Sequence, residues 1–377
     1  MKKLIVTFLI SVFSVCAYAS SEQTTDIYTQ RKMTALMNEY HIPGAAVLLY
    51  NNGELSEYYY GYANKERKEP VIRKTIFELG SISKVMTGIL LAQEIDWAKM
   101  SLTDPVTKYR KGLSKQFDKI TLVDLATHTA GLPFSQPNDI DTQDSLNEYL
   151  ATYTLKTAPG QQWIYSNLGI GLLGEALEQS TEKDFDDLYR RHILNPLQMV
   201  NGVNFPKALI KYYATGYDQH GNSVTYSMSG LLPGATDIKA SAGDMQKFLS
   251  AAIGLPGTPP RVFYPIRMTQ SAYVKVGNSY QGLGWEIHKI ENKSDVTALL
   301  NASDYLGMGP LKVQEIYERA HFDGNALIDR SGGTSGFRAY IAVLPNKKSG
   351  IVMLVNKNIP DRVIVKTARG ILFGMNS

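Results

Sequence analysis

The 377-residue sequence contains one cysteine, Cys16, which lies in the apolar stretch at the start of the chain. If this stretch is removed during export, the mature protein has no thiol. It can then form no disulfide bond and offers no thiolate ligand to a metal.

Long apolar runs are also missing beyond the N-terminus. Lys2 and Lys3 precede an apolar run over residues 4–16, and small residues follow at Ala17 and Ala19. This pattern predicts a signal peptide over residues 1–19 and a periplasmic location for the mature protein. No later apolar run approaches the ~18 residues of a membrane-spanning helix, so we expect no membrane partner.

The chain has no strong excess of either charge. Its formal net charge is +4, from 39 basic and 35 acidic residues. This balance gives no electrostatic basis for binding nucleic acid, so a function must depend on a local site.

The sequence has few histidines and none in a metal-binding spacing. The closest pair among the six, His192 and His220, is 28 positions apart, and no His-Glu-x-x-His or Gly-x-Ser-x-Gly motif occurs. A G-x-G-x-x-G pattern spans residues 169–174, but a helical segment rather than a second strand follows it, which favours close helix packing over dinucleotide binding. We therefore expect no metal and no cofactor.

Secondary-structure patterns divide the chain into its two ends and a middle. Hairpins are predicted at residues 45–62 and 337–356, with helices at residues 29–40 and about 360–373. The middle favours helices, at residues 81–96, 122–128, 146–153, 167–179 and 182–194. We predict an α/β (α+β) fold: an antiparallel sheet formed from both chain ends (20–78 plus 283–377), flanked by terminal helices, with an inserted mostly helical domain (79–282).

The strongest chemical signal is a Ser-x-x-Lys pattern, which occurs at Ser81/Lys84 and at Ser180/Lys183. A lysine one helical turn after a serine lies on the same face and can take its proton if burial lowers its pKa. Ser81 opens an apolar helix, where backbone N–H groups favour negative charge. Ser180 lies in a polar link and is better explained as a helix N-cap.

A second element, Tyr-x-Asn, supplies a further proton carrier and an amide. Of three such tripeptides, those beginning at Tyr50 and Tyr62 belong to the first hairpin. Tyr165 and Asn167 instead stand on a loop just before a helix, where both side chains can face a cleft.

The third element combines a cation, a hydroxyl and a glycine on a strand. Lys348, Ser349 and Gly350 match this pattern literally, but they form the tip of the C-terminal hairpin. Arg330, Ser331 and Gly332 follow a predicted strand and lead into Gly333, in a context suited to holding a substrate against open backbone.

The order and spacing of these elements resemble class C β-lactamases, within the wider family that includes serine DD-peptidases and some esterases. The resemblance covers nearly the whole mature chain and also includes the segments 77–84, 125–133, 282–286 and 350–354. It implies a β-lactamase/transpeptidase-like fold in which Ser81 attacks the lactam carbonyl while Lys84 and Tyr165 manage its proton. It further implies that Asn167 holds a substrate amide and that the backbone N–H groups of Ser81 and Gly333 bind the oxyanion.

The chain departs from that family at several substrate-binding positions. Arg330 replaces the usual lysine and Ser331 the usual threonine, and both are expected to contact a substrate carboxylate. Gln136 lies one place after the family's glutamine position. Asp361 stands at the family's asparagine, and the carboxylate-directed arginine is displaced to Arg362.

The resemblance implies hydrolysis of cephalosporins or penicillins through an acyl-enzyme by a monomeric protein. Two alternatives stay open because a shared site does not determine the substrate. One is a DD-peptidase or esterase of the same fold. The other is a β-lactam or peptidoglycan sensor that is acylated but does not turn over.

Overall fold

The structure, a computed structural model, describes residues 26–202, 207–224, 231–301, 306–321 and 325–374. The predicted signal peptide, residues 1–19, lies outside these residues. Within the described ranges, no helix combines the length and apolar character needed to cross a bilayer.

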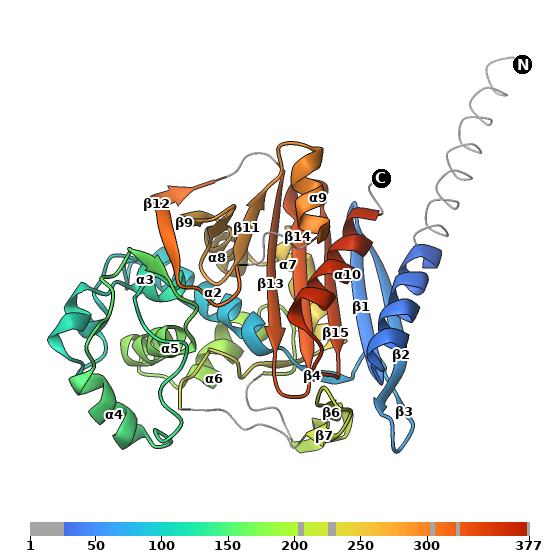
Figure 1. The fold of residues 1–377 in the computed structure, drawn as a ribbon, viewed down its shortest axis with the longest axis horizontal. Coiled ribbons are helices and arrows are strands. Elements are labelled where there is room, and N and C mark those ends of the chain that lie inside the picture. Colours follow the sequence, from blue (N-terminus) through green and yellow to red (C-terminus); the bar gives the residue numbers. More distant parts are fainter. Residues whose placement is uncertain (1–25, 203–206, 225–230, 302–305, 322–324, 375–377) are drawn as a thin grey trace, which may run out of the picture.

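Eleven strands of the described residues form one antiparallel sheet (Figure 1), in the order β3-β2-β1-β15-β14-β13-β11-β10-β9-β12-β5. The strands are β1 (Gly44–Asn51), β2 (Glu54–Asn64), β3 (Glu69–Pro70), β5 (Gln162–Trp163), β9 (Ala272–Val276), β10 (Ser279–Gln281), β11 (Glu286–Lys289), β12 (Leu311–Ala320), β13 (Ala326–Gly333), β14 (Arg338–Leu344) and β15 (Ser349–Val355). Short two-stranded pairs join β4 (Ile76–Glu78) to β8 (Lys239–Ser241) and β6 (Gly216–Tyr217) to β7 (Ser223–Val224).

The two ends of the chain pair with each other inside this sheet, as predicted. β1 pairs with β15, so that Ala45 lies opposite Val355. Both predicted hairpins are present, β1 with β2 and β14 with β15. The first turns through Asn52 and Gly53, whose φ angles of 48° and 88° are left-handed.

Both faces of the central strands are buried, which explains why β1 and β15 are apolar at nearly every position. Ala45, Val47 and Leu49 face one cluster, which contains side chains of α10 (Asp361–Gly374) and of the helix at residues 26–40. These two terminal helices lie in front of the sheet in Figure 1. Alternate residues of β1 face the second cluster, against α7 (Ala242–Ala252).

The middle of the chain is mostly helical, as predicted, and its segment 122–189 lies to one side of the sheet in Figure 1. Its elements are α2 (Ser83–Asp96), α3 (Leu122–Ala126), α4 (Gln143–Thr152), α5 (Asn167–Thr181), α6 (Phe185–Tyr189), the π-helical turn Arg190–Leu194, and α8 (Pro260–Thr269); α9 (Lys293–Asn301) comes later in the chain. Short 3₁₀ turns lie at Gly80–Ile82, Val106–Lys108, Lys115–Lys119, Lys207–Tyr212 and Pro345–Lys347. The segment expected to be helical from residue 182 starts instead at Phe185, because Glu182 has a left-handed φ of 55° that ends α5.

The sheet also takes strands from outside the two chain ends. β9 and β10 precede residue 283, where we expected the chain to return to the sheet, and β5 comes from the helical segment. The division into 20–78 plus 283–377 and 79–282 therefore remains a proposal about how the chain is organised.

Candidate active site

Ser81 lies in the 3₁₀ turn between β4 and α2, at the point where this turn meets the end of β13. Gly80 has a left-handed φ of 52°, and a Cβ on it would lie 2.5 Å from the backbone nitrogen of Gly333. A side chain on Gly332 would collide with the carbonyl oxygen of Leu79. Glycine is thus required on both segments for Ser81 to lie against the strand.

Lys84 is in the first turn of α2, and its ammonium group reaches back to Ser81. Nζ donates a hydrogen bond to Ser81 Oγ at 3.0 Å and another to the Ala235 carbonyl at 2.8 Å. The side chain is fully buried. Burial lowers the pKa of Lys84 to about 8, with the charge of Arg330 acting in the same direction and Tyr165 opposing it.

Tyr165 brings a second hydroxyl to the same serine. Its phenol donates to Ser81 Oγ at 2.7 Å and accepts a hydrogen bond from Arg330 Nη2 at 2.7 Å. Burial raises the pKa of Tyr165, but the positive charges of Arg330 and Lys84 outweigh burial, so the net shift is downward. Ser81 therefore has two titratable groups within hydrogen-bond distance.

Three aromatic rings hold Tyr165 in place. Its ring centre lies 4.5 Å from that of His128, 6.1 Å from Phe134 and 6.2 Å from Trp163. His128 Nδ1 accepts a hydrogen bond from the Ser166 backbone at 3.2 Å. Burial, together with the nearby Arg330 and Lys84, holds the pKa of His128 well below its usual range, so this ring is neutral and serves as packing.

Asn167 is the first residue of α5 and lines the same cavity as Ser81. The N-cap of this helix, Ser166, fixes its position. Ser166 Oγ accepts from the Gly169 backbone at 2.8 Å and donates to the Pro133 carbonyl at 2.6 Å, which anchors the turn. Among the described residues, the buried Oδ1 of Asn167 has no hydrogen-bond partner. A buried, unsatisfied amide oxygen that lines a cavity is suited to receive a donor from a ligand.

The predicted third element lies on β13, as expected from the sequence. Arg330 is 3% exposed and forms an ion pair with Glu286 at 3.5 Å, in addition to its bond to Tyr165. Ser331 Oγ donates to Asp361 Oδ2 at 2.7 Å. The Gly332–Gly333 segment continues the strand beside Ser81.

These groups surround one cavity of about 430 Å³, which is large enough for a drug-sized ligand. It is lined by Ser81, Phe134, Tyr165, Asn167, Thr236, Glu286, Gly307, Met308, Arg330, Ser331, Gly332, Gly333, Thr334, Ser335, Arg338, Asn358 and Asp361. Residues that are far apart in sequence thus converge on the predicted nucleophile.

Two predicted substrate-binding residues lie away from this lining. Gln136 is half-buried on the loop after Phe134, and only Phe134 of that loop reaches the cavity. Arg362 is exposed and donates to the Asn301 carbonyl at 3.2 Å. The phase of α10 explains the second case, because it turns Asp361 toward the cavity and the next residue outward.

The sequence patterns missed two charged residues of the lining, Glu286 and Arg338, and noted Asp361 only as a departure from the family's asparagine. A weak signal existed for Glu286, which ends the segment 282–286 already noted as similar to the family. Arg338 lies opposite Gly333 in the β13–β14 ladder. That pairing register cannot be read from the sequence.

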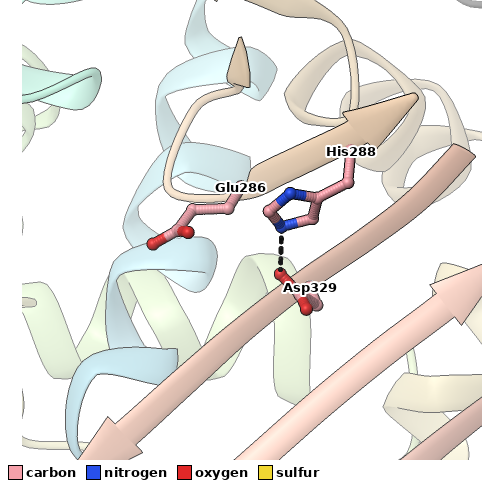
Figure 2. A group of neighbouring side chains, drawn as sticks. All are labelled: Glu286, His288 and Asp329. Atoms are coloured by element: carbon pink, nitrogen blue, oxygen red, sulfur yellow. Dashed lines mark hydrogen bonds and ion pairs between the residues drawn. The ribbon is translucent and has the colours of Figure 1, made fainter. Parts of the chain in front are cut away.

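Glu286, which lines the cavity, forms a cluster with His288 and Asp329 on β11 and β13 (Figure 2). His288 Nε2 lies 3.2 Å from Asp329 Oδ1, and His288 Nδ1 lies 3.1 Å from Ser279 Oγ. Asp329 Oδ2 accepts from Arg369 Nη2 at 2.7 Å and also from the Tyr340 hydroxyl.

The chemistry of this cluster argues against a metal ion. Arg369 already supplies the positive charge, and both oxygens of Asp329 are engaged by the protein. Burial raises the pKa of Asp329, but the charges of Arg369 and His288 outweigh burial and hold it well below its usual range. The cluster is therefore a buried ionic network that supports β13.

The competing motifs have structural explanations. The 169–174 pattern lies inside α5, where side chains on Gly171 and Gly174 would collide with Leu232 and with the Pro233 carbonyl. Close packing, not phosphate binding, accounts for these glycines. Ser180 lies in the last turn of α5 because that helix continues to Thr181, so its predicted role as an N-cap is wrong.

Comparisons with known proteins agree with this geometry. A family model described as Beta-lactamase matches residues 29–373. A β-lactamase of Pseudomonas fluorescens is 33% identical over 344 residues, which cover 90% of this chain and 96% of that protein. A β-lactamase of Escherichia coli (strain K12) is 33% identical over 369 residues, which cover 97% of each chain.

Solved structures give the same result. A class C β-lactamase mutant superposes with a TM-score of 0.88 at 30% identity, covering 93% of this chain and 98% of that one. A class C β-lactamase in complex with cefoxitin gives a TM-score of 0.87 at 30% identity, covering 94% and 99%. The chain therefore belongs to the β-lactamase family and has the fold of its class C members.

Proposed function

We propose that this protein hydrolyses β-lactam antibiotics, cephalosporins or penicillins, through an acyl-enzyme on Ser81. One observation carries the proposal: Ser81 Oγ lies within 3.0 Å of Lys84 Nζ and 2.7 Å of the Tyr165 hydroxyl, at the wall of a ligand-sized cavity. A serine is a weak nucleophile unless a neighbouring group accepts its proton, and two such groups are present here.

In the acylation step, Ser81 Oγ forms a bond to the lactam carbonyl carbon while its proton passes to the Lys84–Tyr165 pair. Because the pKa of Lys84 is about 8, a useful fraction of its amine is neutral near neutral pH. The backbone N–H groups of Ser81 and Gly333 stabilise the oxyanion. The ring C–N bond then breaks, and the pair returns the proton to the leaving nitrogen.

Deacylation requires a base that activates water beside the ester. Tyr165 supports this role, because the charges of Arg330 and Lys84 lower its pKa and stabilise a phenolate. The water attacks the ester carbonyl and its proton passes to Tyr165. The bond between the carbonyl carbon and Ser81 Oγ then breaks, and Tyr165 gives the proton to Ser81 Oγ. A protein without such a group would remain acylated and act as a sensor.

Substrate binding uses the remaining lining groups. The free Oδ1 of Asn167 accepts from the substrate's side-chain amide. The Gly332–Gly333 end of β13 lies along the substrate, with Arg330 and Ser331 on the side that would meet its carboxylate. Gln136 and Arg362 contribute to binding only if the loop or the helix moves toward the cavity.

One experiment separates this function from the two alternatives. Purified mature protein is mixed with a chromogenic cephalosporin, and both absorbance and intact mass are followed. We expect sustained turnover. A long-lived adduct on Ser81 would instead indicate a sensor, and cleavage of D-Ala-D-Ala peptides or small esters without any reaction with β-lactams would indicate a DD-peptidase or esterase.

We further propose that the chain is exported to the periplasm, that its signal peptide ends before Ser20, and that the mature protein acts as a monomer. Support comes from the basic and apolar pattern of residues 2–19. The near-balanced charge gives no basis for nucleic-acid or membrane partners. N-terminal sequencing of the mature protein and its mass by light scattering test these points.

A further inference from the structure

A carboxylate faces the proposed substrate on the wall of the cavity that contains Ser81. Asp361, the first residue of α10, lines this cavity and accepts a hydrogen bond from Ser331 Oγ at 2.7 Å. The hydroxyl proton of Ser331 is therefore directed at Asp361 and not at the open cavity.

The neighbouring cation, Arg330, is also engaged by other residues of the protein. Arg330 is 3% exposed, donates to the Tyr165 hydroxyl at 2.7 Å and pairs with Glu286 at 3.5 Å. Burial lowers the pKa of Arg330, but the negative charges around it, including that of Asp361, raise it overall. The field of Asp361 thus already acts on the guanidinium that a substrate carboxylate would approach.

The cavity wall carries charges of both signs. Its described lining residues contain two guanidinium groups, Arg330 and Arg338, and two carboxylates, Glu286 and Asp361. An anion that binds beside Ser331 lies next to Asp361, which accepts a hydrogen bond from the Ser331 hydroxyl. Repulsion between the substrate carboxylate and the neighbouring Asp361 carboxylate should weaken substrate binding severalfold or more, even at a partly hydrated site.

We propose that Asp361 is a specificity-determining residue that disfavours β-lactams carrying a carboxylate beside the Arg330–Ser331 pair. The enzyme then binds the carboxylate of a cephalosporin or penicillin less tightly than it would with a neutral residue at position 361. This inference rests on the proposed β-lactamase function and concerns the choice of substrate within it.

The test compares a chromogenic cephalosporin with its carboxyl methyl ester, which is identical except for the charge. For wild type and Asp361→Asn, kcat/KM is measured on both compounds at low ionic strength. We expect Asp361→Asn to raise kcat/KM for the acid by about tenfold and to change that for the ester by less than about twofold. Asp184→Asn removes an exposed carboxylate at the N-cap of α6, outside the cavity lining, and should change neither value.

An equal change for both compounds, or a fall for the acid alone, would overturn the proposal. A second measurement does not depend on the variant: in wild type, raising the salt concentration should increase kcat/KM for the acid relative to the ester, because salt screens the repulsion. A ratio that falls or stays constant with salt counts against Asp361. If neither compound forms an adduct on Ser81 of the wild type, the proposed function fails, whatever the role of Asp361.

Discussion

Arg330 and Tyr165, which are 165 positions apart in sequence, are joined by a hydrogen bond of 2.7 Å, and the guanidinium carbon lies 4.9 Å from the centre of the tyrosine ring. This contact makes the arginine part of the environment of the proton carrier. The positive charge of Arg330 stabilises a phenolate on Tyr165. Arg330 also forms an ion pair with Glu286.

Replacement of Arg330 should therefore act on catalysis as well as on binding. In Arg330→Met, the pKa of Tyr165 rises because its main positive neighbour is gone, and we expect kcat near neutral pH to fall at least about tenfold. The loss should shrink as the pH is raised. A pH profile of kcat with a chromogenic cephalosporin measures this, and Arg330→Lys should recover part of the rate. An unchanged profile in Arg330→Met would show that the contact has no catalytic effect.

Ser81→Ala should abolish the acyl-enzyme. No other serine is bonded to both Lys84 and Tyr165 among the described residues. We expect turnover to fall by about a thousandfold or more, with no mass adduct on the protein. Ser180→Ala is the matched control, since it removes the serine of the other Ser-x-x-Lys pattern, and it should react normally. Hydrolysis at the wild-type rate by Ser81→Ala would disprove the assignment of the nucleophile.

The pH dependence of acylation should report on Lys84. Below its pKa of about 8 the amine is protonated and cannot accept a proton, and above it the amine is neutral. The acylation rate should therefore rise with pH toward an apparent pKa that belongs to the coupled Lys84–Tyr165 pair.

Lys84→Arg provides the comparison for this pH profile. The arginine side chain stays protonated at all working pH values and cannot accept a proton. We therefore expect the acylation rate to fall by about a hundredfold or more and its pH profile to lose the rising limb. Stopped-flow measurement of the acylation burst distinguishes the two profiles. A rising limb that persists unchanged in Lys84→Arg would assign it to another group.

The buried network around Asp329 should be important for stability. Asp329→Asn leaves the buried Arg369 without its counter-charge, at a cost of about 3–5 kcal/mol in the free energy of unfolding. Urea denaturation followed by circular dichroism measures the difference, and the exposed Asp141→Asn is the control. A loss below about 1 kcal/mol would mean that the network contributes little to stability.

The same carboxyl predicts acid sensitivity. Its pKa is depressed in the folded state, so the unfolded chain binds its proton first as the pH falls. The contribution of Asp329 to the free energy of unfolding is fully present above the ordinary Asp pKa of ~3.9, and it decreases progressively as the pH falls below that value. The wild type and Asp329→Asn should therefore differ less in stability at pH ~3 than at pH ~7. A difference that grows on acidification would contradict this assignment.

Several features of the fold follow from local patterns. The left-handed turn at Asn52 and Gly53 and the apolar strands on either side predicted the first hairpin. Strands β9, β10 and β11 were missed because they are only three to five residues long, and β12 was missed because polar residues interrupt its alternation. The start of α6 was misplaced because a left-handed Glu182 interrupts an otherwise helical composition.

The sequence by itself determined the local parts of the site. Ser81 and Lys84 are one helical turn apart, so their side chains meet wherever that helix is placed. Tyr165 precedes α5, Asn167 is the first residue of that helix and Ser166 is its N-cap. Arg330 lies on β13, in the strand context that the order of motifs indicated.

Only the tertiary structure decided which charges face the substrate. Helix phase turns Asp361 toward the cavity and Arg362 away from it, and strand register brings Arg338 opposite Gly333. Neighbouring residues in a helix or strand point in different directions. A shift of one position therefore exchanges a cation for an anion, and only long-range packing determines that position.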